Sequence, residues 1–99
     1  MSRPVTRDAL IVASDSQVSC EVRGEAVILG LDRGIYYGLN PVGARIWELV
    51  QRPRTLEEIT HAIVEEFEVE PERAGTDAHR LLQELQALNL VTVLDESPR

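Results

Sequence analysis

The sequence has little of several residue types, and each shortage excludes a class of protein. Its 99 residues include a single cysteine, Cys20, so an intramolecular disulfide framework and a cysteine-based zinc cluster are impossible. Aromatic residues make up only 4% of the chain, so a core must come mainly from Leu, Ile, Val and Ala. The longest apolar run, residues 9–13, is too short for a membrane span or a secretory signal. We therefore expect a cytoplasmic protein that does not bind membranes.

Lysine is absent, and the ten basic residues, all arginine, face 17 acidic ones, for a net charge of −7. Residues 41–99 hold twelve of the acids and six of the arginines, so the acidity is concentrated there. Nucleic-acid affinity comes largely from basic side chains that meet phosphates. The composition therefore argues against a nucleic-acid partner.

What is present is typical of one small α+β domain over residues 1–99. The apolar fraction of 43% and the charged fraction of 27% are those of a globular chain. The first half has strand-like patterns and the second half has helical ones. We predict an N-terminal arm over 1–16, a three-stranded antiparallel β-meander over 17–39, three helices over 40–90 and a tail over 91–99.

The meander follows from short runs of β-forming residues. Val18, Cys20 and Val22 alternate with polar residues, which predicts a half-buried strand with Cys20 as an inert core thiol. The continuous apolar run 26–31 suits a central strand, and residues 35–39 supply the third.

Capping residues indicate where the predicted helices begin. Asn40 is a good N-cap for a helix to about residue 51, and Thr55 with Glu58 forms a capping box for the second. Pro71 favours a loop over 68–73, so the third helix is predicted over 73–89. Two apolar runs, 10–13 and 91–94, are further candidate strands.

No group of residues has the pattern of a catalytic or metal site. His61 and His79 fall at polar positions of different helices, without the close ligand spacing that zinc requires. No serine lies in a G-x-S-x-G motif, and the glycines occur singly, so they form no phosphate-binding loop. The glutamates over 65–72 are typical of a solvated face. We therefore predict a binding module without catalytic activity, cofactor or metal.

The third predicted strand offers a place to bind. Residues 35–39 contain neither lysine nor proline, the residues that usually protect an exposed strand edge, and they include Tyr36 and Tyr37. Such an edge can accept an extended peptide as an additional strand. The alternative is that the tyrosines only pack on the helices, and the pattern alone leaves both open.

The sequence that contains this third predicted strand resembles that of the PqqD-like family. It comprises Gly24-Glu-Ala-Val-Ile-Leu-Gly-Leu-Asp-Arg-Gly-Ile-Tyr-Tyr-Gly-Leu-Asn40 and then Val42-Gly-Ala-Arg-Ile-Trp47. The likeness extends over about residues 17–94, and the form Tyr-Tyr-Gly-Leu-Asn-x-x-Gly in a free-standing chain is most similar to the B1 proteins of lasso-peptide biosynthesis. The resemblance implies a winged helix-turn-helix-like RiPP recognition element, which holds the leader segment of a ribosomally made precursor peptide.

The resemblance also implies a site and partners. The leader would pair with the third strand, in the groove between it and the third helix, and would be presented to a B2-type cysteine protease and a cyclase. In that groove Leu81 and Leu85 would form an apolar floor and Asp77, Arg80 and Glu84 a polar rim; the alternative is that both leucines are simply core. The implied peptide-binding residues are Ile35, Tyr36, Tyr37, Gly38, Leu39, Asp77, Arg80, Leu81, Glu84, Leu85 and Leu88.

Two other functions remain open. The same fold in pyrroloquinoline quinone biosynthesis delivers its peptide to a radical SAM enzyme. A winged-helix DNA-binding protein is the second alternative, but its third helix would offer only Arg80 as a cation between Asp77 and Glu84.

Overall fold

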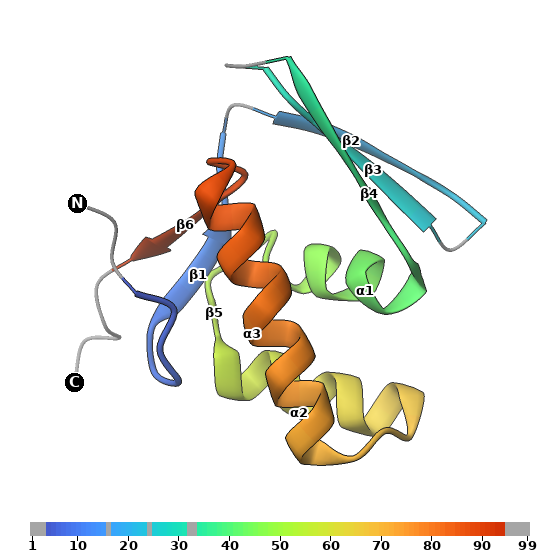
Figure 1. The fold of residues 1–99 in the computed structure, drawn as a ribbon, viewed down its shortest axis with the longest axis vertical. Coiled ribbons are helices and arrows are strands. Elements are labelled where there is room, and N and C mark those ends of the chain that lie inside the picture. The colour runs from blue at the N-terminus through green and yellow to red at the C-terminus, as the bar shows by residue number, and fades with distance from the viewer. Residues whose placement is uncertain (1–3, 16, 24, 32–33, 95–99) are drawn as a thin grey trace.

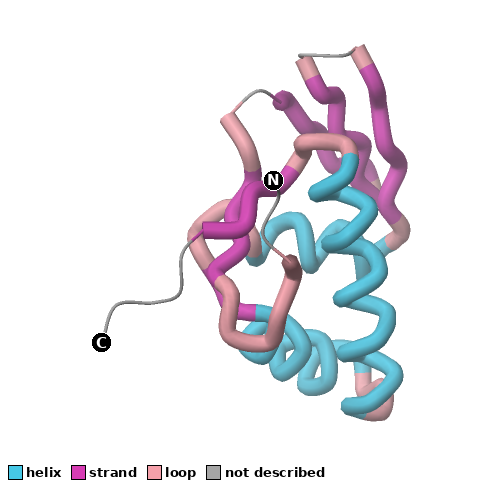
Figure 2. The backbone as a smooth tube through the Cα atoms, turned by 60° about the vertical axis from the view of Figure 1, so that its left-hand side comes forward, coloured by secondary structure: helices cyan, strands magenta, loops and turns pink. Residues whose placement is uncertain are grey.

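The computed structural model describes residues 4–15, 17–23, 25–31 and 34–94, and it confirms the α+β arrangement (Figure 1). The strands are β1 (Leu10–Ala13), β2 (Gln17–Val22), β3 (Glu25–Gly30), β4 (Ile35–Leu39), β5 (Arg54–Thr55) and β6 (Val91–Leu94). The helices are α1 (Pro41–Leu49), α2 (Leu56–Phe67) and α3 (Pro71–Ala87). The meander lies at one end of the molecule, and the connection between α2 and α3 lies at the other (Figures 1 and 2).

The predicted meander is a three-stranded antiparallel sheet in the order β2-β3-β4. Ile28 in β3 lies opposite Ser19 in β2 and Tyr37 in β4. Alternate residues of β3, beginning with the buried Ala26 and Ile28, point toward the helices, and the residues between them point to the outer face. Because β3 is the central strand, its register decides which face of β2 and β4 is covered.

The prediction that Cys20 is a core thiol is wrong, because Cys20 is exposed. It lies opposite Val27, and Val18 lies opposite Leu29, all on the outer face of the sheet. Val18 is 53% exposed. The alternation in β2 correctly predicts a strand, but alternation alone does not say which of its two faces meets the helices.

A second sheet, in the order β5-β1-β6, joins segments that are far apart in the sequence. Ile11 of β1 pairs with Arg54 of β5 and with Val93 of β6. Both candidate strands at 10–13 and 91–94 therefore form, so the predicted arm and tail each contain a strand. The short β5 was not predicted.

The helix starts follow local chemistry. Asn40 caps α1 by accepting the Gly43 N–H at 2.8 Å. Both hydrogen bonds of the predicted capping box form, since Thr55 Oγ1 accepts the Glu58 N–H at 3.1 Å and the Glu58 carboxylate accepts the Thr55 N–H at 2.9 Å. The third helix begins at Pro71 rather than Arg73, because proline has no N–H to lose in a first turn.

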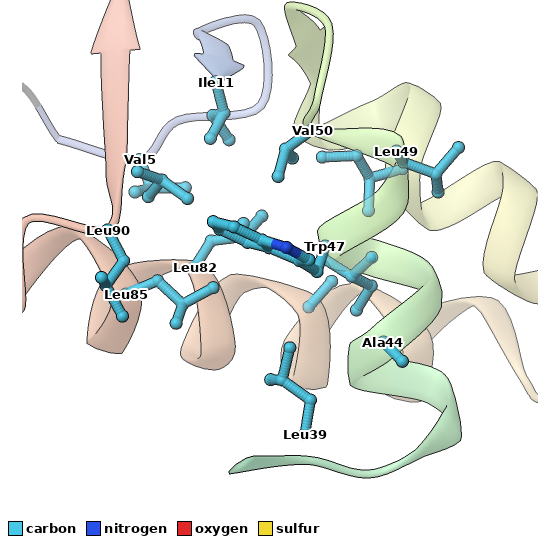
Figure 3. Close-up of a cluster of buried hydrophobic side chains, with 14 of the residues drawn as sticks. Val5, Ile11, Leu39, Ala44, Trp47, Leu49, Val50, Leu82, Leu85 and Leu90 are labelled. Atoms are coloured by element: carbon cyan, nitrogen blue, oxygen red, sulfur yellow. The ribbon is translucent and has the colours of Figure 1, made fainter. Parts of the chain in front are cut away.

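The core lies between the helices and both sheets, around Trp47 of α1, and includes Ile11 of β1 and Val93 of β6 (Figure 3). Ile28, Leu82 and Leu85 are fully buried in it, and each contributes about 1.5–3 kcal/mol by leaving water. The indole N–H of Trp47 donates to Ser19 Oγ at 3.1 Å, so its polar atom is satisfied. This packing fixes the sheet and α3 relative to each other.

Candidate functional site

Strand β4 is an open edge of the meander, because among the residues that the structure describes it pairs with β3 alone. The Gly34 N–H donates to the Gly30 carbonyl at 2.9 Å, so the polar groups of Gly30 face β4. The backbone N–H and C=O groups of its partner Ile35 therefore face β3, and the direction of these groups alternates from one residue to the next along a strand. The backbone N–H and C=O groups of Tyr36 and Gly38 are thus directed at the open edge.

A groove of about 780 Å³ runs beside this edge, between β4 and the three helices. The inward-facing residues Tyr37 and Leu39 form one wall and the side of α3 forms the other. The lining residues are Tyr37, Gly38, Leu39, Asn40, Val42, Gly43, Ile46, Ile63, Val69, Arg73, Ala74, Asp77, Ala78, Arg80, Leu81 and Glu84. An extended segment paired with β4 would therefore place every second side chain over an apolar floor.

The structure brings seven of the eleven predicted residues to this groove: Tyr37, Gly38, Leu39, Asp77, Arg80, Leu81 and Glu84. Leu85 is not part of the floor, because it is fully buried in the core. Leu88 packs against that core outside the groove, and Ile35 is half-buried beyond its end. Tyr36 is 74% exposed and lies on the opposite face of the sheet.

Several groove residues were not predicted, and most come from α1 and from the start of α3. Asn40, Val42, Gly43 and Ile46 reach the groove because α1 begins directly after β4. Ala74 and Ala78 leave room on α3 where longer side chains would fill it. Ala74 and Ala78, one turn apart on the same face of the third helix, could have indicated the groove from the sequence. Small residues on a helix face indicate either a close approach by another element or a hollow.

Charges of both signs lie on the α3 wall. Asp77 lies between Arg73, at 3.8 Å, and Arg80, at 4.0 Å. All three side chains are more than half exposed, so these pairs contribute at most about 1 kcal/mol each. They are therefore available to interact with a bound chain, and they do not form the continuous basic surface that a phosphate backbone needs.

A hydrogen bond joins the two walls of the groove, since the Tyr37 hydroxyl donates to the Glu84 carboxylate. This hydrogen bond, partial burial and the negative charge of Glu84 together raise the pKa of Tyr37 from 10.0 to about 12. The neutral phenol is the form that can donate. The bond therefore links β4 to α3 at the end of the groove away from Leu39.

We expect the Tyr37 phenol to ionise near pH 12 in the folded protein and at a lower pH after Glu84→Gln, which removes the negative charge while partial burial still raises the pKa. Because its pKa is raised on folding, Tyr37 stabilises the fold fully below pH 10, and this contribution is lost as the pH rises through 12. Tyrosinate absorbance measures the titration, with Tyr36→Phe as the background that leaves Tyr37 as the one remaining tyrosine. An unchanged midpoint in Glu84→Gln would contradict this assignment.

The outer face of the meander is apolar and exposed. Exposed side chains on it include Val18, Val27, Leu29 and Tyr36, with exposed fractions from 37% to 74%. Leu31, beyond the end of β3, is 56% exposed. Contiguous apolar surface of this kind marks interaction sites in soluble proteins.

Across the described part of the chain, no three His, Cys, Asp or Glu side chains are placed to hold a metal ion. None of the three helices has the length and apolar character needed to cross a membrane, within the same residues.

The family model for coenzyme PQQ synthesis protein D (PqqD) matches residues 25–91, which include the meander edge, the groove and all three helices. This chain belongs to the PqqD family. Within this PqqD-family chain the groove lies between β4 and α3, as the resemblance in sequence implied. None of the curated proteins compared with the chain matches it.

Two solved structures have the same fold as this PqqD-family chain. "TbiB1 in complex with the TbiA(beta) leader peptide" is 33% identical, with a TM-score of 0.75, and covers 88% of this chain and 99% of its own. "Lasso peptide synthetase B1 complexed with the leader peptide" is 20% identical, with a TM-score of 0.70, over 86% of this chain and 98% of its own. Each of those proteins was solved with a leader peptide.

Proposed function

We propose that this chain binds the leader segment of a ribosomally made precursor peptide as an additional antiparallel strand on β4. The observation that carries this is the open edge of β4 directly beside an apolar groove. The outward polar groups of Tyr36 and Gly38 offer backbone hydrogen bonds, and the groove offers selection of side chains. The leader peptides bound to the two similar structures support it.

The shape of the groove restricts what can occupy the edge. The link from Tyr37 to Glu84 holds α3 close beside β4. A second folded copy that paired through its own β4 would bring its α3 into the same space. A bare extended peptide carries no such helix, so the arrangement favours a leader over self-association through this edge.

The chain presents the leader and does not process it. The exposed thiol of Cys20 lies on the outer face with no histidine among its pocket neighbours, so the usual cysteine–base pair is missing in the described residues. Processing then belongs to separate enzymes, a cysteine protease that removes the leader and a cyclase. The β2 side of the apolar outer face, around Val18, is the surface we assign to the protease, because it belongs to the same sheet as the strand that holds the leader.

The test uses the purified chain, a synthetic leader of the kind bound to the similar structure, TbiA(beta), the corresponding precursor and a leader protease that acts on that precursor. We expect the chain to bind the leader in calorimetry and to leave the precursor uncleaved on its own. We expect the protease to cleave the precursor faster when the chain is present. Absence of leader binding by the folded chain would refute the proposal.

A substitution on β2 tests the assignment of the outer face. Val18→Glu places a charge on this face two strands away from the leader, so leader affinity should not change. Cleavage by the protease should slow by about tenfold, because a charge must then be desolvated in the interface. Thr92→Glu, an exposed position on the other sheet, is the matched control and should cleave normally.

A further inference from the structure

Gly38 lacks the usual structural reasons for a glycine. A Cβ added at Gly30 would meet Leu90 Cδ2 at 3.0 Å, one added at Gly43 would meet Leu39 Cδ2 at 3.1 Å, and Gly34 has a positive φ of 64°. At Gly38, by contrast, φ is not positive and an added Cβ would have nothing within 4 Å among the described residues. Glycine weakens a strand, and in this position it often marks a close approach by another chain.

A hollow of about 500 Å³ lies over Gly38, on the outer face of the sheet. Gly38 is opposite Val27 of β3, which is opposite Cys20 of β2, so the hollow crosses all three strands. Arg23 and Asn40 are among the polar residues at its margin. It meets the groove at Gly38, Leu39 and Asn40, which line both, but the rest of the groove lies on the side of the sheet that faces the helices.

The register of an added strand directs one side chain into this hollow. The backbone of Gly38 faces the open edge, so a strand paired with β4 places one residue directly opposite it. In an antiparallel pair, opposite residues point to the same face, with their Cα atoms about 5.5 Å apart when they exchange hydrogen bonds. The residue opposite Gly38 therefore points to the outer face, and its neighbours point into the groove.

We propose that the hollow over Gly38 is a second subsite for the leader, and that it receives one bulky apolar or aromatic side chain. This proposal rests on leader binding at β4. The missing side chain of Gly38 lets the incoming one lie flat across β4 and contact Val27. The exposed ring of Tyr36, two residues along the same face, flanks it as a diagonal cross-strand neighbour. The leader is then held from both faces of the sheet.

Gly38→Val tests the subsite, because it fills the hollow without a clash and valine favours strands. We expect the variant to melt at the same temperature as the unchanged protein or higher. Its affinity for the synthetic leader should fall by about tenfold or more, through lost apolar contact. Gly38→Ala, which fills less of the hollow, should lose less.

Alanine substitutions along the leader identify the side chain concerned. At one position, alanine should weaken binding to the unchanged protein and leave Gly38→Val with no further loss, which is the sign of a direct contact. The leader residues on either side of it should not show this coupling.

Any of the following results would overturn the proposal of a leader subsite over Gly38. If Gly38→Val binds the leader normally, the hollow is not used by the leader; if cleavage slows while binding is normal, its occupant belongs to the protease. A loss that is equal for every alanine leader would assign the effect to the strand backbone. If the unchanged protein binds no leader, leader recognition itself fails, which is a different outcome from these.

Discussion

Leu82→Asp is expected to unfold the protein, whereas Leu81→Asp, one position along α3, is expected to leave it folded and unable to hold the leader. Leu82 is fully buried in the core beside Trp47, and an unpaired carboxylate there costs several kcal/mol out of a total stability of about 5–15 kcal/mol. Leu81 is half-buried and lines the groove. Its replacement should weaken leader binding by about 2 kcal/mol or more, which is roughly thirtyfold.

Circular dichroism melts and leader calorimetry separate the two effects. Leu81→Asn is the matched control, since it removes the same apolar contact as Leu81→Asp without adding a charge. It should lose less affinity, and both variants at position 81 should melt cooperatively. If Leu81→Asp unfolds and Leu82→Asp remains stable, the face of α3 assigned to the groove is wrong.

Tyr36→Pro is expected to remove most leader binding while the meander stays intact. Proline has no N–H, and the N–H of Tyr36 is one of the two in β4 that we infer to face the open edge. The loss should be about 1–2 kcal/mol for the hydrogen bond, with more from the ring that obstructs the incoming strand. Calorimetry with the leader measures it.

Two further variants test whether backbone direction is the cause. Tyr36→Ala keeps the N–H and removes the side chain, so it should bind the leader better than Tyr36→Pro. Tyr37→Pro removes an N–H that faces β3 and should instead destabilise the sheet. Normal leader binding by a folded Tyr36→Pro protein would rule out strand addition at this edge.

Much of the fold could be predicted from the sequence because its signals are local. Asn40 and the pair Thr55 and Glu58 mark helix starts through hydrogen bonds within one turn, and these bonds form. The β5-β1-β6 sheet could not be predicted, because its strands pair across most of the chain and β5 has only two residues. Such pairing depends on tertiary packing.

Seven of the residues proposed for the site line one groove, and the positions that were misplaced show what the sequence leaves undetermined. In β2 the apolar Val18 and Cys20 share one face, and that alternation predicts a core position for Cys20, but the face they share is the exposed outer one. On α3, Leu81 and Leu85 are one turn apart, yet only Leu81 reaches the groove. The placement of these residues depends on how α3 is rotated against the sheet, which the spacing of leucines leaves undetermined.

The direct junction between β4 and α1 limits the length of leader peptide that can pair with β4. Leu39 ends the strand and is buried, Asn40 caps the helix, and Pro41 begins it, so no loop residue allows β4 to slide or lengthen. Five residues at about 3.3 Å each span about 16 Å, which is the reach of the pairing. A leader that is recognised over so short a stretch places no requirement on the rest of the precursor. The sequence that follows the leader is therefore free to diversify.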